Sequence, residues 1–379
     1  MYNFAEKQLG HDFAREKLED FRKLIDASTS FVAMSMPGVG ASYFLKYLAC
    51  HGFAHFIHVD LYSLPSLTLH EFYKLLLEEI LLTSKESKPT FEVLPASDAD
   101  LFRETKNILR VLAEKNSKTV IIFSRFDQLT KEFDANFLSN LQSLTTTVPG
   151  KIVLIFTSIK PLSEISPDAV TGGNLTFYSK YLYFKPYSEE DLKKLLKIDP
   201  EPIPSSSDLN ELIKLSGGHF QLLKILLNSQ KEQLILDQFV KLQMKGLIDY
   251  LDYTQRKQIQ KVALRQAQGK PISEIDDYLL GVGMINDNRL FSPLLAEYVR
   301  QNISVKLPPK EAKLFRLLRN SMGKIVDKEE IFNALWPDGE GSNWALDALV
   351  YRLRKHPFIQ NQGYIIESHK KVGYTLTAV

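Results

Sequence analysis

The first half of this chain alternates short, continuous apolar runs with segments of helical periodicity. The apolar runs, rich in β-branched and aromatic residues, lie at residues 31–36, 54–59, 119–123 and 152–156, with a weaker one at 181–184. Runs of this length without polar alternation are typical of strands that are buried on both faces of a sheet. Strands that alternate with helices predict an α/β fold built on a doubly wound parallel sheet.

The turn after the first predicted strand has the pattern of a phosphate-binding loop. Glycines there let the backbone fold around a phosphate, and the following helix offers N–H donors at its N-terminus. Against the consensus GxxxxGK[ST], Gly40 and Ser42 match, whereas Ser35 replaces the first glycine and Ala41 replaces the lysine. The candidate nucleotide-binding residues are Pro37, Gly38, Val39, Gly40, Ala41, Ser42 and Tyr43.

The missing lysine limits what this loop can do. In a phosphate loop that lysine neutralises charge on the β- and γ-phosphates, and Ala41 has no charge. Lys46 lies a full helical turn further on and is not expected to reach back. Backbone donors and Ser42 remain to hold ATP or ADP weakly, without efficient hydrolysis. The alternative is a strand–helix turn that keeps its glycines for geometry alone.

The strand that should carry a magnesium-binding aspartate lacks it. Residues 119–123 lead into Ser124, which has no carboxylate to offer Mg²⁺. Asp127 is expected past the strand end, as a turn or capping residue. Thr157 and Ser158 end the fourth strand, where a polar residue often senses a γ-phosphate, although a strand-end turn explains them equally well. We therefore assign no catalytic residue and no metal ligand.

Four further motifs occur along the first 300 residues. They are FAREKL at residues 13–18, HVDL at 58–61, SGGH at 216–219 and LFSPL at 290–294. Together with the loop, these motifs resemble those of the STAND/AAA-type P-loop ATPases of prokaryotes. The resemblance implies a P-loop domain, a helical lid and a small winged-helix subdomain. Besides the two catalytic positions, the chain departs from the family at Ala14, which replaces a glycine, and at Phe220, which replaces a proline.

Charge is distributed unevenly along the chain. The whole sequence has 47 Lys+Arg against 45 Asp+Glu, a net charge of +2. Residues 304–379 carry 12 basic and 8 acidic side chains, a net charge of +4, so the remainder stands at −2. This asymmetry predicts different partners for the two parts. The single cysteine, Cys50, and the lack of any apolar run of about 18 residues favour a cytoplasmic protein that does not enter a membrane.

Residues 304–379 contain a helix with two distinct faces, expected at residues 343–355. Its apolar residues have the spacing of a buried face; they are Leu346, Leu349, Val350 and Leu353. The opposite face is polar, aromatic and basic, which suits the major groove of DNA. Two strands follow, at residues 364–368 and 373–377, and the turn between them is a short cationic arm. The alternative is a solvated helix face and a lysine-rich turn.

Four stretches in and around this helix form a recognisable pattern. They are residues 307–317, 330–336, 346–355 and 366–374. They resemble the OmpR/PhoB-type winged helix of response regulators over the whole segment. In that family, the residue at the position of Arg352 contacts bases, that of Trp336 approaches phosphate, and that of Lys370 enters the minor groove. Lys371 replaces the usual wing glycine, and Trp344 replaces a common polar residue. The candidate DNA-binding residues are Trp336, Trp344, Ala348, Tyr351, Arg352, Lys355, His369, Lys370 and Lys371.

These patterns predict four domains. They are a P-loop NTPase-like α/β domain (1–187), a helical lid (188–240), a small winged-helix subdomain (241–303) and an OmpR/PhoB-type winged helix (304–379). The expected function is regulation of transcription by binding double-stranded DNA, with the degenerate ATPase domain as a platform that senses a signal, binds a protein partner or self-associates. Two alternatives are a nucleotide-dependent switch ATPase acting on DNA and a scaffold whose winged helix binds protein.

Overall fold

The structure is a computed structural model that covers most of the chain. It describes residues 9–84, 97–128, 133–198, 206–229, 234–268, 274–302, 308–337, 339, 341–356, 359, 364–369 and 372–378. The chain divides into two compact units, Met1–Gln258 with Ile272–Leu295, and Ile259–Pro271 with Ala296–Val379. The boundaries of the four domains expected from the sequence stay a prediction.

A five-stranded parallel sheet forms the centre of the first unit. Its strands lie in the order β2-β3-β4-β1-β5, and every neighbouring pair is parallel. All five apolar runs form strands, so the predicted doubly wound α/β fold is confirmed. The strands are β1 (Phe31–Ser35), β2 (His55–Asp60), β3 (Thr119–Ser124), β4 (Ile152–Ser158) and β5 (Tyr181–Phe184).

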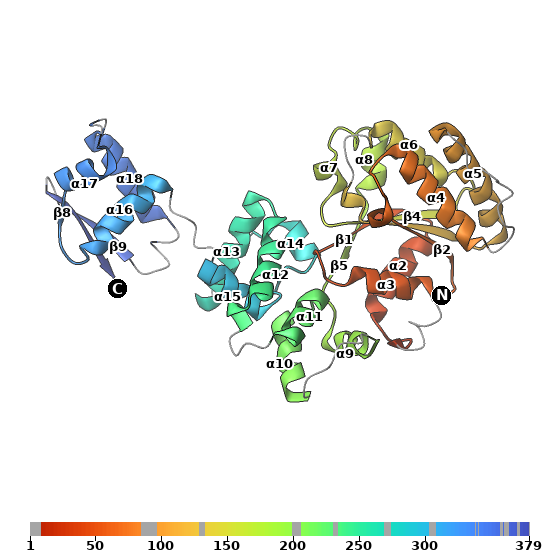
Figure 1. Ribbon diagram of the computed structural model, residues 1–379, viewed down its shortest axis with the longest axis horizontal. Helices are drawn as coiled ribbons and strands as arrows, with labels where there is room; N and C mark the ends of the chain where they lie inside the picture. The colour runs from red at the N-terminus through yellow and green to blue at the C-terminus, as the bar shows by residue number, and fades with distance from the viewer. Residues whose placement is uncertain are drawn as a thin grey trace. The chain divides into compact units, whose positions relative to one another are not determined.

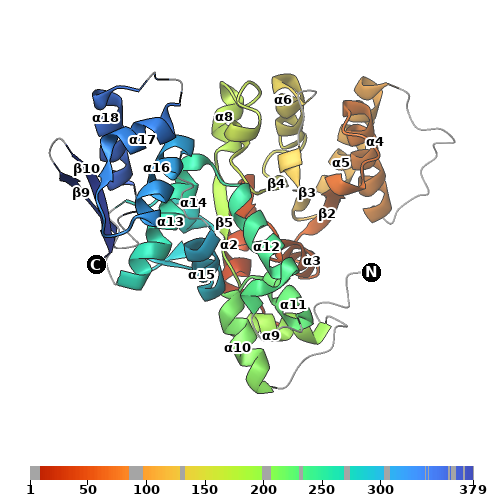
Figure 2. The ribbon, with the colours of Figure 1, turned by 60° about the vertical axis from the view of Figure 1, so that its left-hand side comes forward.

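Helices cover both faces of this sheet. In Figures 1 and 2, α2 and α3 lie on one face, and α4, α6 and α8 lie on the other. The second face packs through aromatic rings: Phe72 stacks on Phe123 at 5.7 Å between ring centroids, and Phe123 stacks on Phe156 at 5.3 Å. The helices are α2 (Arg15–Asp26), α3 (Ala41–Ala49), α4 (Leu69–Thr83), α5 (Asp98–Lys115), α6 (Ala135–Leu144), α7 (Leu162–Ile165) and α8 (Gly173–Tyr178), with the short turns η1 (Leu61–Ser63) and η2 (Phe126–Gln128).

Local sequence signals fix the ends of these helices. Thr68, Ser97 and Asp134 each accept a hydrogen bond from a backbone N–H in the first turn of α4, α5 and α6. Ala14, at the position where the resembling motif has glycine, has a φ of 46°. Its amide donates to Asp191 Oδ1 at 2.9 Å, which fastens the start of α2 to α9 (Glu189–Ile198).

Between β5 and residue 302, the described residues are mostly helical. Strands β6 and β7 form a hairpin with a two-residue turn. Asp287 and Asn288 in this turn both have positive φ, as a type I′ turn requires. Within the part of the chain that the structure describes, no helix is long and apolar enough to cross a membrane. The elements after α9 are α10 (Ser206–Ser216), α11 (Phe220–Asn228), η3 (Leu234–Leu236), α12 (Gln238–Asp249), α13 (Tyr253–Gln268), α14 (Asp277–Gly281), β6 (Ile285–Asn286), β7 (Arg289–Leu290) and α15 (Pro293–Asn302).

Three helices and a three-stranded antiparallel sheet make up the end of the chain. Strand β10 lies between β8 and β9. The predicted apolar face of α18 is buried in one core with apolar residues of α16 and β10. This order of elements confirms the winged-helix fold expected for the segment. The elements are α16 (Pro309–Asn320), β8 (Val326–Asp327), α17 (Lys328–Leu335), α18 (Asn343–Lys355), β9 (Tyr364–His369) and β10 (Gly373–Ala378).

Candidate phosphate loop and candidate nucleic-acid interface

The predicted phosphate loop joins β1 to α3 in the expected geometry. Strand β1 ends at Ser35 and α3 begins at Ala41. Gly38 and Gly40 have φ values of 73° and 100°, in the region that glycine adopts at no steric cost. The turn is therefore built as predicted, while its part in binding a nucleotide stays a prediction.

The start of α11 lies directly against this loop. The amide of Gln221 donates to the Gly38 carbonyl at 3.1 Å, and a Cβ added to Gly38 would overlap the Gln221 side chain. The Tyr187 hydroxyl donates to the Gly40 carbonyl at 2.9 Å, and the rings of Tyr43 and Phe220 meet edge to face at 5.0 Å. Loop carbonyls thus accept hydrogen bonds from the start of α11 and from Tyr187, which follows β5.

His219, in the motif SGGH, makes a third hydrogen bond to a carbonyl of this loop. Its Nδ1 accepts a hydrogen bond from the amide of Leu222 at 3.2 Å, which leaves the proton on Nε2. Nε2 then donates to the Pro37 carbonyl at 2.8 Å. Complete burial lowers the pKa of His219 to about 4. The imidazole is therefore neutral near neutral pH and joins α11 to the phosphate loop.

A histidine contacts the serine that replaces the magnesium-binding aspartate. Ser124 Oγ lies 2.5 Å from His58 Nε2, and burial lowers the pKa of His58. Asp127 lies past β3 in η2, as predicted, where burial raises its pKa. Thr157 Oγ1 accepts a hydrogen bond from the amide of Arg125, the residue after β3, at 2.8 Å. Ser158 Oγ accepts from the amide of Lys160 at 3.2 Å, within the turn that follows β4. Among the described residues, no three His, Cys, Asp or Glu side chains could hold a metal ion together.

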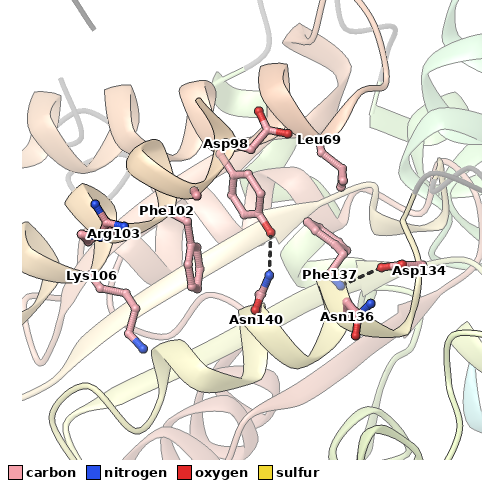
Figure 3. A pocket seen from close by; sticks show the side chains of 11 residues that line it. Leu69, Asp98, Phe102, Arg103, Lys106, Asp134, Asn136, Phe137 and Asn140 are labelled. Carbon is pink, nitrogen blue, oxygen red and sulfur yellow. Dashed lines mark hydrogen bonds between the residues drawn. The ribbon is translucent and has the colours of Figure 1, made fainter. Parts of the chain in front are cut away.

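A hollow of about 600 Å³ between α4, α5 and α6 was not predicted from the sequence. Figure 3 shows Phe102 and Phe137 in its wall. Asn140 Nδ2 donates a hydrogen bond to the Tyr73 hydroxyl at 3.4 Å. Asp98 accepts from His70 at 2.9 Å, and Asp134 caps α6. Both carboxylates in the hollow are therefore bound within the protein, as expected of a packing groove.

In the winged helix, the outer face of α18 carries the residues expected there. The helix begins with Ser342, whose hydroxyl accepts from the amide of Ala345 at 3.2 Å. Trp344 is 81% exposed and Tyr351 is 56% exposed, and the Lys355 ammonium lies 4.5 Å from the Tyr351 ring centroid. Ala348 is half-buried between them. These four residues lie along one side of the helix, as their spacing predicts.

Arg352 has a contact that the sequence did not reveal. Its Nε donates to Glu311 Oε1 at 2.9 Å, and the Glu311 side chain on α16 is only 7% exposed. The one local signal for this contact is that Glu311 lies on the apolar face of α16, at helical spacing from Leu314 and Leu318. A carboxylate on such a face calls for a cation nearby. Arg352 therefore stabilises the winged-helix domain by pairing with the buried carboxylate of Glu311.

Two further predicted DNA-binding residues, Trp336 and His369, lie outside α18. Trp336 is half-buried beside Phe332, with the Lys310 ammonium 5.2 Å from its ring. His369 Nε2 lies 2.8 Å from Thr375 Oγ1 across the wing strands. Lys370 and Lys371 lie outside the described residues.

Replacing Arg352 with alanine should lower the free energy of unfolding of the winged helix by about 1–2 kcal/mol. The buried Glu311 carboxylate would lose its partner, although the exposure of Arg352 moderates the cost. Urea denaturation followed by fluorescence would measure this, with Arg316→Ala, an exposed arginine of α16, as the matched control. Replacing Glu311 and Arg352 together by methionine should restore most of the loss. Equal stability of Arg352→Ala and Arg316→Ala would contradict the structural role.

Comparison with known proteins identifies this segment. Residues 301–376 match the family model described as "Transcriptional regulatory protein, C terminal". The C-terminal domain is an OmpR/PhoB-type winged helix. The matched residues run from before α16 into β10. No curated protein matches the chain.

Several solved structures are similar to the chain that carries this winged helix. A Walker-type ATPase of Pyrococcus abyssi is 18% identical with a TM-score of 0.47, covering 79% of this chain and 96% of that one. Cdc6p from Pyrobaculum aerophilum is 12% identical with a TM-score of 0.41, covering 98% and 91%. A STAND protein of Pyrococcus horikoshii is 16% identical with a TM-score of 0.34, covering 92% and 51%.

Proposed function

We propose that this protein regulates transcription by binding double-stranded DNA through its C-terminal winged helix. The observation that carries the proposal is the match of residues 301–376 to a transcriptional regulatory family. The basic balance of residues 304–379 and the exposed outer face of α18 support it. The candidate DNA contacts are those expected from the sequence, with Arg352 in a supporting role on the helix flank.

The α/β domain acts in this proposal as a sensing or interaction platform. Ala41 removes the cation that phosphoryl transfer needs, and Ser124 removes the carboxylate for Mg²⁺. The hydrogen bonds from the lid to Pro37 and Gly38 give the loop a structural role in the absence of catalysis. Such a domain is suited to weak binding of ATP or ADP, to a protein partner or to self-association.

DNA binding should depend strongly on salt. If about four phosphates are neutralised, the affinity of the full chain for a mixed-sequence duplex should fall about a hundredfold between about 50 and about 200 mM salt. Fluorescence anisotropy of a labelled duplex measures this. Lys355→Ala should reduce the salt slope by about one, whereas Lys257→Ala, an exposed lysine of α13, should leave it unchanged. Failure to bind any duplex at the lower salt concentration would refute the proposed function.

The same titration with and without ATP or ADP tests whether the platform communicates with the winged helix. A change in DNA affinity that Ser42→Ala removes would support sensing through the phosphate loop. Nucleotide turnover that Ser42→Ala abolishes would instead favour the switch ATPase.

A further inference from the structure

The outer face of α18, which would face DNA, is aromatic. Arginine is the side chain that most often makes specific base contacts in the major groove. Trp344 is the most exposed large apolar side chain among the described residues, and Tyr351 lies two turns further along the same side of the helix. Ala348 places a methyl group between them, so the three positions follow one line at spacings of four and three residues. An exposed apolar line of this kind on a small domain indicates a contact surface.

Both arginines of α18 are bound to protein acceptors. Arg352 donates through Nε to Glu311, as described above. Arg354 donates through Nε to the Ile366 carbonyl at 2.8 Å and through Nη2 to Ser368 Oγ at 2.6 Å, which ties it to β9. Each guanidinium is therefore drawn toward a flank of the helix. The side chains that project from the centre of the outer face are the two aromatic ones.

The charged residues around this aromatic line leave its centre apolar. Asp347 accepts a hydrogen bond from the Tyr374 hydroxyl at 2.5 Å, so its carboxylate is held toward the wing sheet. Lys355 lies over the Tyr351 ring at the end of the helix, where an ammonium suits a phosphate rather than a base edge. The surface thus combines an apolar centre with a cation at its border.

We propose that α18 recognises thymine by apolar contact with its 5-methyl group, using Trp344 and Tyr351. This inference rests on the proposed function. The thymine methyl is the apolar group that a base pair presents in the major groove, and aromatic and small apolar side chains are its partners. A guanine-rich site would call for extended arginine or lysine side chains at the centre of the helix. Trp344 and Tyr351 supply apolar area instead, and Ala348 allows the helix to come close.

The direct test removes the methyl group from the DNA. The probe is a duplex of alternating dA and dT of about two helical turns, compared with the same duplex containing deoxyuridine in place of thymidine. The full-length protein should bind the uracil duplex about tenfold more weakly at the same salt concentration, as expected for two buried methyl groups. Conversely, 5-methylation of cytosine in an alternating dG–dC duplex should raise the affinity.

Variants assign the effect to these side chains. Trp344→Ala and Tyr351→Ala should each weaken binding to the dA–dT duplex and shrink the preference for thymine over uracil. Met322→Ala, which truncates an exposed apolar side chain away from α18, is the matched control and should keep the full preference. Since Trp344 is mostly exposed, its replacement should leave the fold intact, which far-UV circular dichroism checks. Trp344→Lys should retain salt-dependent binding while losing the methyl preference.

The outcomes separate this inference from the function on which it rests. Salt-dependent binding with equal affinity for thymine and uracil duplexes would overturn the thymine contact and leave the DNA-binding function standing. No binding to any of the four duplexes would overturn both, and would favour a winged helix that contacts protein. A methyl preference that persists unchanged in Trp344→Ala and Tyr351→Ala would assign the contact to other residues and refute the proposal.

Discussion

Replacing Gly217 with alanine should lower the free energy of unfolding of the first unit by about 2–5 kcal/mol. Gly217 has a φ of 59°, and a Cβ there would overlap the carbonyl oxygen of Phe291. The substitution therefore combines a left-handed backbone with a clash against another backbone segment, which cannot rotate away. Gly218, with a φ of 88°, has the same relation to the Tyr187 carbonyl and should behave alike.

The matched control for this prediction is Gly246→Ala. Gly246 lies inside α12, and a Cβ there would meet no atom within 4 Å. Alanine should therefore stabilise the protein by up to about 1 kcal/mol. Both tryptophans of the chain lie in the winged helix, so far-UV circular dichroism during urea denaturation is the better measurement for this unit. A Gly217→Ala variant as stable as the wild type would show that the turn between α10 and α11 adapts.

Acidification should destabilise the first unit through His219 by about 3 kcal/mol between pH 6.5 and pH 4. An unfolded chain binds a proton at this histidine near its ordinary pKa of 6.5, whereas the folded protein resists protonation until about pH 4. In that interval the unfolded state binds more protons, so the free energy of unfolding falls as pH falls. Above pH 6.5 the imidazole is neutral in both states, and this contribution is constant.

A His219→Gln variant isolates the effect. Glutamine can still donate to the Pro37 carbonyl but does not titrate, so its stability should change less between the same pH values. Burial also lowers the pKa of His58, which adds to the acid sensitivity of both proteins. The difference between wild type and variant is therefore the quantity to measure, by urea denaturation at a series of pH values. If the free energies of unfolding of wild type and His219→Gln fall in parallel as pH falls, His219 is not the source of the acid sensitivity.

Elements whose pattern is local were predictable from the sequence. Strands β1, β3 and β4 are buried on both faces, so they appear as continuous apolar runs with few alternatives. Helix α18 lies where its apolar spacing and the capping Ser342 place it. The turn after β1 was predictable because two glycines, Gly38 and Gly40, follow a buried strand closely and permit the positive φ values of a tight turn.

Contacts between distant segments were not predictable in this way. The pairing of Arg352 with Glu311 joins two helices, and periodicity assigns Arg352 to the outer face without showing what lies beside it. The contact of His219 with Pro37 spans 182 positions of the chain. The motif SGGH contributed to the family resemblance that implies a helical lid, but only the tertiary structure brings the His219 imidazole against the phosphate loop. Such contacts depend on how elements pack, which local sequence does not encode.

The hydrogen bonds from α11 to the phosphate loop have a mechanical consequence. Because Gln221 and His219 donate hydrogen bonds to the carbonyls of Gly38 and Pro37, the start of α11 is attached to the loop that follows β1. That strand is not at an edge of the sheet but lies between β4 and β5. A force applied to α11 must therefore either break these bonds or be transmitted to an interior strand of the sheet. The loop and α11 are thus coupled through protein hydrogen bonds.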